Sequence, residues 1–170
     1  MEDLVASAFD VPATRVIVPS GRTIKRYNLH VDMPGTNPKA LQSAIEKALA
    51  IGLKVKARRQ TLDRDILLLG ATAETAGHLD KIEPPAQRYC IFLPIPPDKT
   101  VTCVSGSFDE LASAAESALG TPVANRTGLD GTITAKLPAG SLAKSLNKDL
   151  GLTLTKARQP VKIVMVSPAS

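Results

Sequence analysis

A serine and a lysine one helical turn apart are the first residues whose types and spacing suggest chemistry. The stretch Ser141-Leu142-Ala143-Lys144 matches S-x-x-K, a pattern in which the lysine activates the serine as a nucleophile at a helix start. The companion patterns S-D-N and K-T-G do not occur in the sequence. We therefore interpret Ser141 as the N-cap of a helix and not as a nucleophile.

Other reactive groups are sparse. His30 and His78 are the only histidines, too few and too isolated for a metal site. The sequence contains no G-x-S-x-G, no P-loop and no dinucleotide fingerprint. We therefore predict no catalytic residue, no metal site and no cofactor. An enzyme with an unrecognised site is the alternative, and a cleft that joined Arg126, Asp130 and Ser141 would support it.

Residues 125–131, with the sequence NRTGLDG, form the candidate ligand-binding turn. Its two glycines indicate a tight connection with positive φ. A turn of this kind exposes charged side chains and backbone amides to a ligand. The candidate binding residues are Arg126, Thr127, Gly128, Asp130 and Gly131. A purely structural connection is the alternative interpretation.

The densest basic cluster consists of Lys54, Lys56, Arg58 and Arg59. If this stretch is a strand, alternation puts the first three on one face, where they would follow a phosphate backbone. No aromatic residues interleave with them for stacking on bases. We therefore interpret the cluster as the solvated outer face of a half-buried sheet, and keep nucleic-acid binding as a weaker alternative. The net charge of +5 indicates only non-specific attraction to anions.

The two cysteines, Cys90 and Cys103, lie in the predicted strands 89–95 and 100–104. If these strands pair as a hairpin about the prolines between them, the cysteines fall nearly opposite each other. A cross-strand disulfide is then geometrically plausible, and it would agree with an oxidising compartment. Two buried free thiols are the alternative.

Composition predicts a folded globular chain. The 170 residues are 44% apolar, which is enough for one generous domain or two small ones. Only 3% are aromatic, so Leu, Ile, Val and Ala must build the core. No stretch reaches the roughly 20 apolar residues of a membrane span. The acidic start, Met1 to Leu4, does not resemble a signal peptide, so we expect either a cytosolic chain or a trimmed leader.

Periodicity predicts an α+β fold of two similar halves, each made of helix-strand-strand units. We expect a mainly antiparallel or mixed sheet with helices packed on one face. The first half spans 1–83, a linker spans 84–88, and the second half spans 89–170. The expected helices are 2–9, 38–51, 108–119 and 141–150. The expected strands are 15–18, 26–33, 53–59, 65–69, 89–95, 100–104, 122–124, 132–137, 152–155 and 161–166.

An internal similarity supports the two halves. The segment 51–58, IGLKVKAR, resembles 150–158, LGLTLTKAR, and each follows an amphipathic helix and precedes an apolar strand. Chance similarity between short alternating strands is the alternative.

The turn Thr127-Gly128-Leu129-Asp130-Gly131 and the later Leu150-Gly151-Leu152 carry a family resemblance, together with RYNLHVDM and ILLLGA upstream. Their order over nearly the whole chain resembles the soil-associated family of uncharacterised bacterial proteins. The resemblance implies an envelope or secreted location, sometimes as an appendage of a beta-lactam-sensor-type membrane metallopeptidase, and no established activity. The chain departs from the family by lacking the leader and first strand, and at Asn125, at Thr132-Ile133-Thr134 and at Ala50-Ile51.

The rhythm of elements is also similar to the small periplasmic domains at the front of secretins and signalling outer-membrane receptors. Those domains bind other proteins and do no chemistry. We therefore expect a non-catalytic cell-envelope interaction or sensing module in the periplasm or outside the cell. Its partner would be another envelope protein or a wall-associated ligand. A cytosolic location is the alternative.

Overall fold

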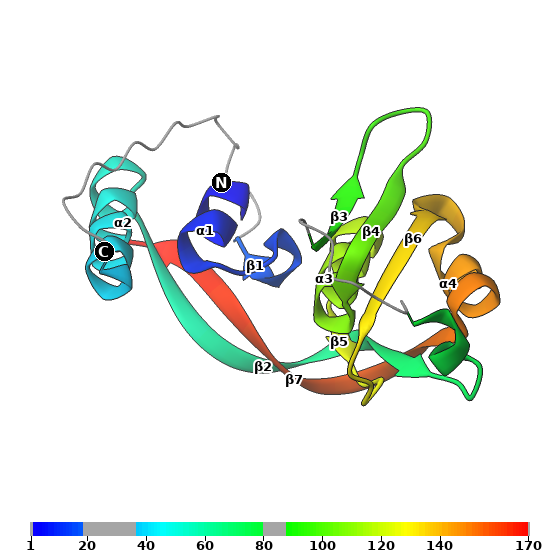
Figure 1. Cartoon of the computed structure of the whole chain (residues 1–170). Helices are drawn as coiled ribbons and strands as arrows, with labels where there is room; N and C mark the ends of the chain where they lie inside the picture. Colours follow the sequence, from blue (N-terminus) through cyan, green and yellow to red (C-terminus); the bar gives the residue numbers. More distant parts are fainter. Residues whose placement is uncertain (1, 19–36, 80–87, 170) are drawn as a thin grey trace. The chain divides into compact units, whose positions relative to one another are not determined.

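The computed structural model describes residues 2–18, 37–79 and 88–169, which form an α+β fold (Figure 1). The predicted fold class is confirmed. The predicted strand 26–33, which contains His30, lies outside the described residues. The helices are α1 (Glu2–Phe9), α2 (Pro38–Gly52), α3 (Phe108–Leu119) and α4 (Leu142–Leu150), with 3-10 turns at Ala13–Arg15, Thr75–His78 and Ala139–Ser141. The strands are β1 (Val16–Ile17), β2 (Val55–Ala71), β3 (Tyr89–Leu93), β4 (Thr100–Ser107), β5 (Val123–Asn125), β6 (Thr132–Pro138) and β7 (Leu152–Pro168).

The strands form two sheets, in the orders β1-β7-β2-β5 and β3-β4-β6. In the first sheet β1 runs parallel to β7, with Val16 opposite Val164, and β5 runs parallel to β2, with Leu67 opposite Val123. In the second sheet β4 is antiparallel to both β3 and β6.

The predicted hairpin of strands 53–59 and 65–69 is wrong, because β2 is one continuous strand. Its middle residues, 58–63, are all exposed, so their side chains show none of the apolar alternation that marks a half-buried strand. The neighbouring β7 replaces the predicted strands 152–155 and 161–166 in the same way. A strand exposed on both faces is stabilised by the backbone bonds of its ladder, which the side-chain pattern does not reveal.

The chain folds into two compact units. Unit 1 comprises residues 1–63 and 160–170, and unit 2 comprises 64–159. The chain therefore passes from one unit to the other within β2 and again within β7. This division differs from the predicted halves, whose linker lies outside the described residues except for Arg88. The internal similarity of those halves stays a prediction.

Unit 1 has a core of aliphatic side chains around Phe9. The apolar stripe of α1 and the last turns of α2 meet the start of β2 and the end of β7 there. The buried members are Val5, Ala6, Phe9, Val16, Ile45, Leu49, Val55, Val164 and Val166.

Unit 2 has a larger core between the β3-β4-β6 sheet, helices α3 and α4, and the neighbouring parts of β2, β5 and β7. The inward side chains of β4 and β6 share this core with the apolar faces of both helices, so the helices cover one face of that sheet. These inward residues are Val101, Cys103, Ile133 and Leu137.

Helix α3 has a capping box at its start. The Glu110 amide donates to Ser107 Oγ at 3.2 Å, and the Ser107 amide donates to Glu110 Oε2 at 2.7 Å. These reciprocal bonds satisfy two amide groups that the helix itself leaves without acceptors. Gly120 ends the helix in the left-handed conformation.

Helix α4 ends against a 3-10 turn through Gly151. Its φ of 63° suits glycine, and a Cβ at this position would lie 2.9 Å from the Thr75 amide nitrogen. The Gly151 carbonyl oxygen accepts from the Thr72 amide at 3.0 Å and from the buried Thr75 hydroxyl at 2.7 Å. The glycine recognised in the Leu-Gly-Leu motif therefore allows a close approach of two backbones.

Glu116 is a fully buried acidic residue on α3. Its Oε2 accepts a hydrogen bond of 3.0 Å from the amide of Val123, the first residue of β5. A buried amide that loses its acceptor costs more free energy than an average hydrogen bond contributes. Glu116 therefore holds the chain in place where it leaves α3 and enters the sheet.

We expect Glu116→Leu to lower the free energy of unfolding by about 1–3 kcal/mol, because the Val123 amide loses this acceptor. Glu116→Gln keeps a side-chain oxygen at the same place and should cost less. Urea denaturation followed by circular dichroism measures both variants. Equal stability of the two variants would contradict this role of Glu116.

Candidate functional site

The 125–131 turn is held by hydrogen bonds of its own side chains. Asn125 Oδ1 accepts from the Thr127 amide at 3.0 Å and from the Thr127 hydroxyl at 2.8 Å. Thr127 Oγ1 in turn lies 3.4 Å from the Leu129 amide that donates to it. Asn125 Nδ2 donates to Asp109 Oδ1 at 2.9 Å, which an ionised aspartate in place of Asn125 could not do. Asn125 therefore has a structural role in the turn.

The two charged side chains of the turn, Arg126 and Asp130, are exposed. The Arg126 backbone amide donates to the Leu69 carbonyl of β2 at 2.8 Å, which anchors the turn to the sheet. The Arg126 guanidinium donates to Gln159 Oε1 at 3.3 Å, a contact on the surface. The arrangement is an anchored loop that presents one positive and one negative group to solvent.

Both glycines of the turn have positive φ. Gly128 has a φ of 65°, and Gly131 has a φ of 142°, a conformation that essentially only glycine adopts. A Cβ on Gly131 would also lie 3.2 Å from Leu79 Cδ2. The predicted tight turn is therefore present, and the candidate residues Arg126, Thr127, Gly128, Asp130 and Gly131 lie on it.

The basic residues at the start of β2 divide between two faces. Lys54, Lys56 and Arg58 are exposed, while Val55 between them is buried. Lys54 adopts a φ of 51°, and its carbonyl oxygen accepts from the Ala169 amide at 2.8 Å. The alternation that the sequence predicts for these positions is therefore the observed one.

Arg59 is directed to α1 instead. Its Nη2 donates to the Phe9 carbonyl oxygen at 2.6 Å, and its Cζ lies 5.7 Å from the centre of the Phe9 ring. A cation at the carboxyl end of a helix satisfies a terminal carbonyl and complements the helix dipole. Arg59 therefore connects β2 to α1 and does not extend the exposed basic face.

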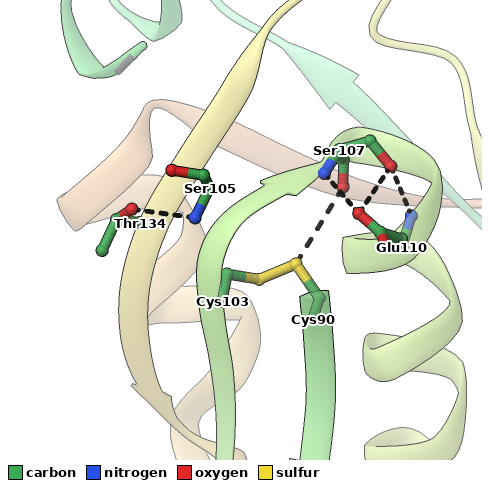
Figure 2. The surroundings of a disulfide bond; sticks show 6 residues. All are labelled: Cys90, Cys103, Ser105, Ser107, Glu110 and Thr134. Atoms are coloured by element: carbon green, nitrogen blue, oxygen red, sulfur yellow. Dashed lines mark hydrogen bonds between the residues drawn. A yellow bond between two sulfur atoms is a disulfide. The ribbon is translucent and has the colours of Figure 1, made fainter. Parts of the chain in front are cut away.

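The hairpin of β3 and β4 contains a disulfide (Figure 2). Cys90 lies directly opposite Cys103, and the two Sγ atoms are 2.06 Å apart. Cys103 is buried and Cys90 is half-buried. The Ser107 carbonyl oxygen lies 4.0 Å from Cys90 Sγ. Because a disulfide sulfur carries no hydrogen, this approach is a contact and not a donated hydrogen bond.

A β-bulge interrupts β4 directly after the disulfide. The register between β4 and β6 shifts between Cys103 and Gly106. Ser105 adopts a φ of 42°, and its amide donates to Thr134 Oγ1 at 3.0 Å (Figure 2). A bulge of this kind bends the strand and redirects the side chains that follow it.

Gly106 separates the bulge from the helix cap. A Cβ at this position would clash with Cys90 Sγ and would lie 2.9 Å from the Tyr89 carbonyl oxygen. Glycine is therefore required beside the disulfide. Figure 2 shows that the bulge and the capping residues Ser107 and Glu110 follow Cys103 directly in the chain. The disulfide joins this segment to β3 through Cys90.

Ser141 precedes α4 as predicted, but its hydroxyl makes no capping bond. Ser141 Oγ instead lies 3.5 Å from Ser145 Oγ. A 3-10 turn leads directly into α4 and takes the place of a side-chain cap. Ser141 and Lys144 are both exposed.

Both units have hollows among their described residues, including the following three. A hollow of about 650 Å³ in unit 2 is bordered by Asp65, Leu119 and Lys156. A second of about 470 Å³ lies near Lys99 and Lys136, and one of about 340 Å³ in unit 1 is bordered by Arg59 and Lys162. None of the three is lined by Arg126, Asp130 or Ser141, which the enzyme alternative required together.

In the part of the chain that the structure describes, no three His, Cys, Asp or Glu residues are grouped so as to hold a metal ion. No helix within the same residues has the length and apolar character needed to cross a membrane.

Sequence reasoning missed two residues of unit 2, Ser105 and Glu116. The small residues of Ser105-Gly106-Ser107 within a strand are a signal for a bulge, since glycine is unfavourable in a regular strand. Glu116 gave no comparable signal, because an acidic residue on a helix is normally exposed.

We expect the protein, unfolded in guanidinium chloride without reductant, to contain no thiol that reacts with iodoacetamide, because Cys90 and Cys103 are bonded to each other. Unfolding is needed because Cys103 is buried and a free thiol there would also escape the reagent. Mass spectrometry of the alkylated protein, with and without reductant, measures this. Two alkylated cysteines in unreduced protein taken from an oxidising compartment would contradict the bridge. Cys90→Ala provides the control, since its unfolded chain should contain one thiol, Cys103, that is alkylated without reductant.

Comparison with known protein families covers nearly the whole chain. Residues 2–169 match the family described as "Protein of unknown function (DUF3738)". No curated protein and no solved structure gives a significant match. The predicted membership of an uncharacterised family is thereby confirmed, whereas the soil association, the envelope location and the similarity to secretin domains stay predictions. The chain belongs to the DUF3738 family of proteins of unknown function.

Proposed function

We propose that the chain is a non-catalytic interaction or sensing module of the cell envelope. It binds another envelope protein or a wall-associated ligand through the 125–131 turn. The observation that carries this proposal is the organisation of the turn itself, which is anchored and internally hydrogen-bonded yet exposes Arg126 and Asp130.

A turn of this kind is suited to binding because its shape is set before the partner arrives. A flexible loop must become ordered when it binds, and this ordering costs free energy. A preorganised loop avoids most of that cost. Arginine is over-represented among residues that dominate binding energy, because its guanidinium forms several directed hydrogen bonds. The carboxylate of Asp130 would accept a hydrogen bond from the same partner.

The disulfide supports the location. Disulfides persist mainly in oxidising compartments, such as the periplasm and the extracellular space. The Cys90–Cys103 bridge and the resemblance to envelope proteins therefore agree with a periplasmic or secreted module.

The test is affinity capture from envelope extracts with the full chain immobilised, compared with Arg126→Ala and Asp130→Ala variants. We expect each variant to retain about tenfold less of the captured partner, a loss that corresponds to about 1.4 kcal/mol. Quantitative mass spectrometry of the retained protein or wall fragments provides the measurement.

The matched control is Lys144→Ala, which removes an exposed charge from α4 in the same unit. It should retain the partner as the wild type does. A partner retained equally by all variants would contradict the role of the turn. A wild-type chain that retains nothing specific would contradict the interaction module itself.

A second candidate, binding of a polyanion by unit 1, is favoured by the distribution of charge. Eleven Lys or Arg and six Asp or Glu residues fall within 1–63 and 160–170, against ten of each within 64–159. The whole net charge of +5 therefore belongs to unit 1. Its exposed basic face consists of Lys54, Lys56 and Arg58.

For this second candidate we expect retention on heparin at low salt that is lost steeply between about 50 and 200 mM salt, because binding to phosphates or sulfates releases counterions. The double variant Lys56→Ala and Arg58→Ala should elute at lower salt, whereas Lys144→Ala in the neutral unit should not. Failure of the wild type to bind heparin at low salt would exclude this function.

A further inference from the structure

Strand β3 forms an edge of the β3-β4-β6 sheet within the described residues. Its five residues have the sequence YCIFL, with neither a charge nor a proline among them. Soluble proteins usually protect an edge strand with charged residues, a proline or a bulge, because its free backbone groups pair readily with another strand. Such features only flank β3, since Arg88 precedes the strand and Pro94 follows and ends it.

The side chains of β3 alternate between the core and an uncovered face. Cys90 and Phe92 pack against the core of unit 2. Tyr89, Ile91 and Leu93 therefore point to the opposite face of the sheet, which neither α3 nor α4 covers. Ile91, at the centre of the strand, has 42% of its surface exposed.

The register of the hairpin determines which backbone groups of β3 point outward. The Cα atoms of Cys90 and Cys103 are 4.0 Å apart, the short spacing of a pair that does not exchange backbone hydrogen bonds. The N–H and C=O groups of Cys90 therefore point away from β4. By alternation the same holds for Phe92, which lies opposite Val101.

We propose that this edge is a self-association site, at which β3 pairs antiparallel with β3 of a second copy of the chain. A two-fold axis through Ile91 places Cys90 of each copy opposite Phe92 of the other. This register pairs all the outward backbone groups of β3 in both copies. An axis through Cys90 or Phe92 leaves some of those groups without a partner inside the strand.

The side chains are self-complementary in this register. Ile91 lies directly opposite Ile91 of the second copy, in the closely spaced kind of pair, and their exposed surfaces cover each other. Tyr89 lies opposite Leu93 of the second copy on the same face, an aromatic and aliphatic pair that stabilises antiparallel strands. An isologous interface requires such self-complementarity.

The self-complementary register and the charge of unit 2 both favour a second copy as the occupant. Residues 64–159 carry ten basic and ten acidic side chains, so two copies of unit 2 meet without net repulsion. An uncharged apolar strand also offers nothing to select a charged peptide. Pairing of five residues makes a small interface, so we expect a reversible dimer that depends on concentration. This inference goes beyond the binding role proposed for the turn and uses a different surface.

The test is the oligomeric state of the full chain, measured by sedimentation velocity over a concentration series. We expect the wild type to form a reversible dimer. Ile91→Lys and Ile91→Glu should each weaken dimerisation by more than about tenfold, because like charges would face each other across the axis. An equimolar mixture of these two variants should regain the dimer, since the opposite charges then face each other.

The matched control is Leu62→Lys, which adds the same charge at another exposed aliphatic residue and should leave the dimer unchanged. Circular dichroism verifies that the variants fold. A wild type that stays monomeric up to its solubility limit would overturn the proposal, whether or not β3 binds a foreign peptide. Dimers of unchanged strength in both Ile91 variants, or a mixture that stays monomeric, would also overturn it.

Discussion

The register of β3 against β4 is the constraint on which unit 2 depends. Cys90 and Cys103 occupy directly opposite positions and are bonded to each other, so neither strand can slide past the other. A slip of one residue would turn every side chain of β3 to the wrong face. With the register held, Val101 and Cys103 enter the core, and Ile91 remains on the uncovered face.

The bulge at Ser105 changes the register of β4 against β6 after the disulfide. Without the extra residue, β4 would continue with a regular alternation into α3. The bulge lets the inward positions of β6 meet the core on both sides of the shift, since Leu137 lies opposite Val101 and Ile133 opposite Gly106. Gly106 then passes beside the disulfide, and Ser107 begins the helix. The position of the edge strand β3, the core of unit 2 and the start of α3 therefore all depend on β4, which has eight residues.

The two units differ in the surfaces that they expose. Unit 1 carries the net positive charge and an exposed basic face at the start of β2. Unit 2 is neutral and offers an anchored turn with one charge of each sign, together with an apolar strand edge.

Local patterns predicted most of the elements of unit 2. The capping box at Ser107 and the leucines of α4 at 142, 146 and 150 follow from helix rules that need only neighbouring residues. The glycines of the 125–131 turn predicted its tight conformation equally well, because a positive φ strongly favours glycine. The conformation of the turn was therefore predictable from neighbouring residues, whereas the binding role of its side chains stays a prediction.

Features that depend on distant partners were not predictable. The exposed middle of β2 has the sequence pattern of a polar loop, because its side chains lack apolar alternation, yet the strand continues through it beside β7. The sequence places Arg59 in a basic cluster. Its contact with Phe9 joins residues 50 positions apart, so no local pattern could predict it. Buried Glu116 has no local signature, since its acceptor role exists only once β5 has reached the end of α3.

Amide hydrogen exchange of dilute protein, resolved by residue with NMR, tests the account most directly. The register predicts that the Ile91 amide, which bonds to β4, is strongly protected. The neighbouring Cys90 and Phe92 amides face outward and should exchange at rates near those of an exposed chain. Protection of Cys90 and Phe92 equal to that of Ile91 in the monomer, or the reverse alternation, would contradict the account.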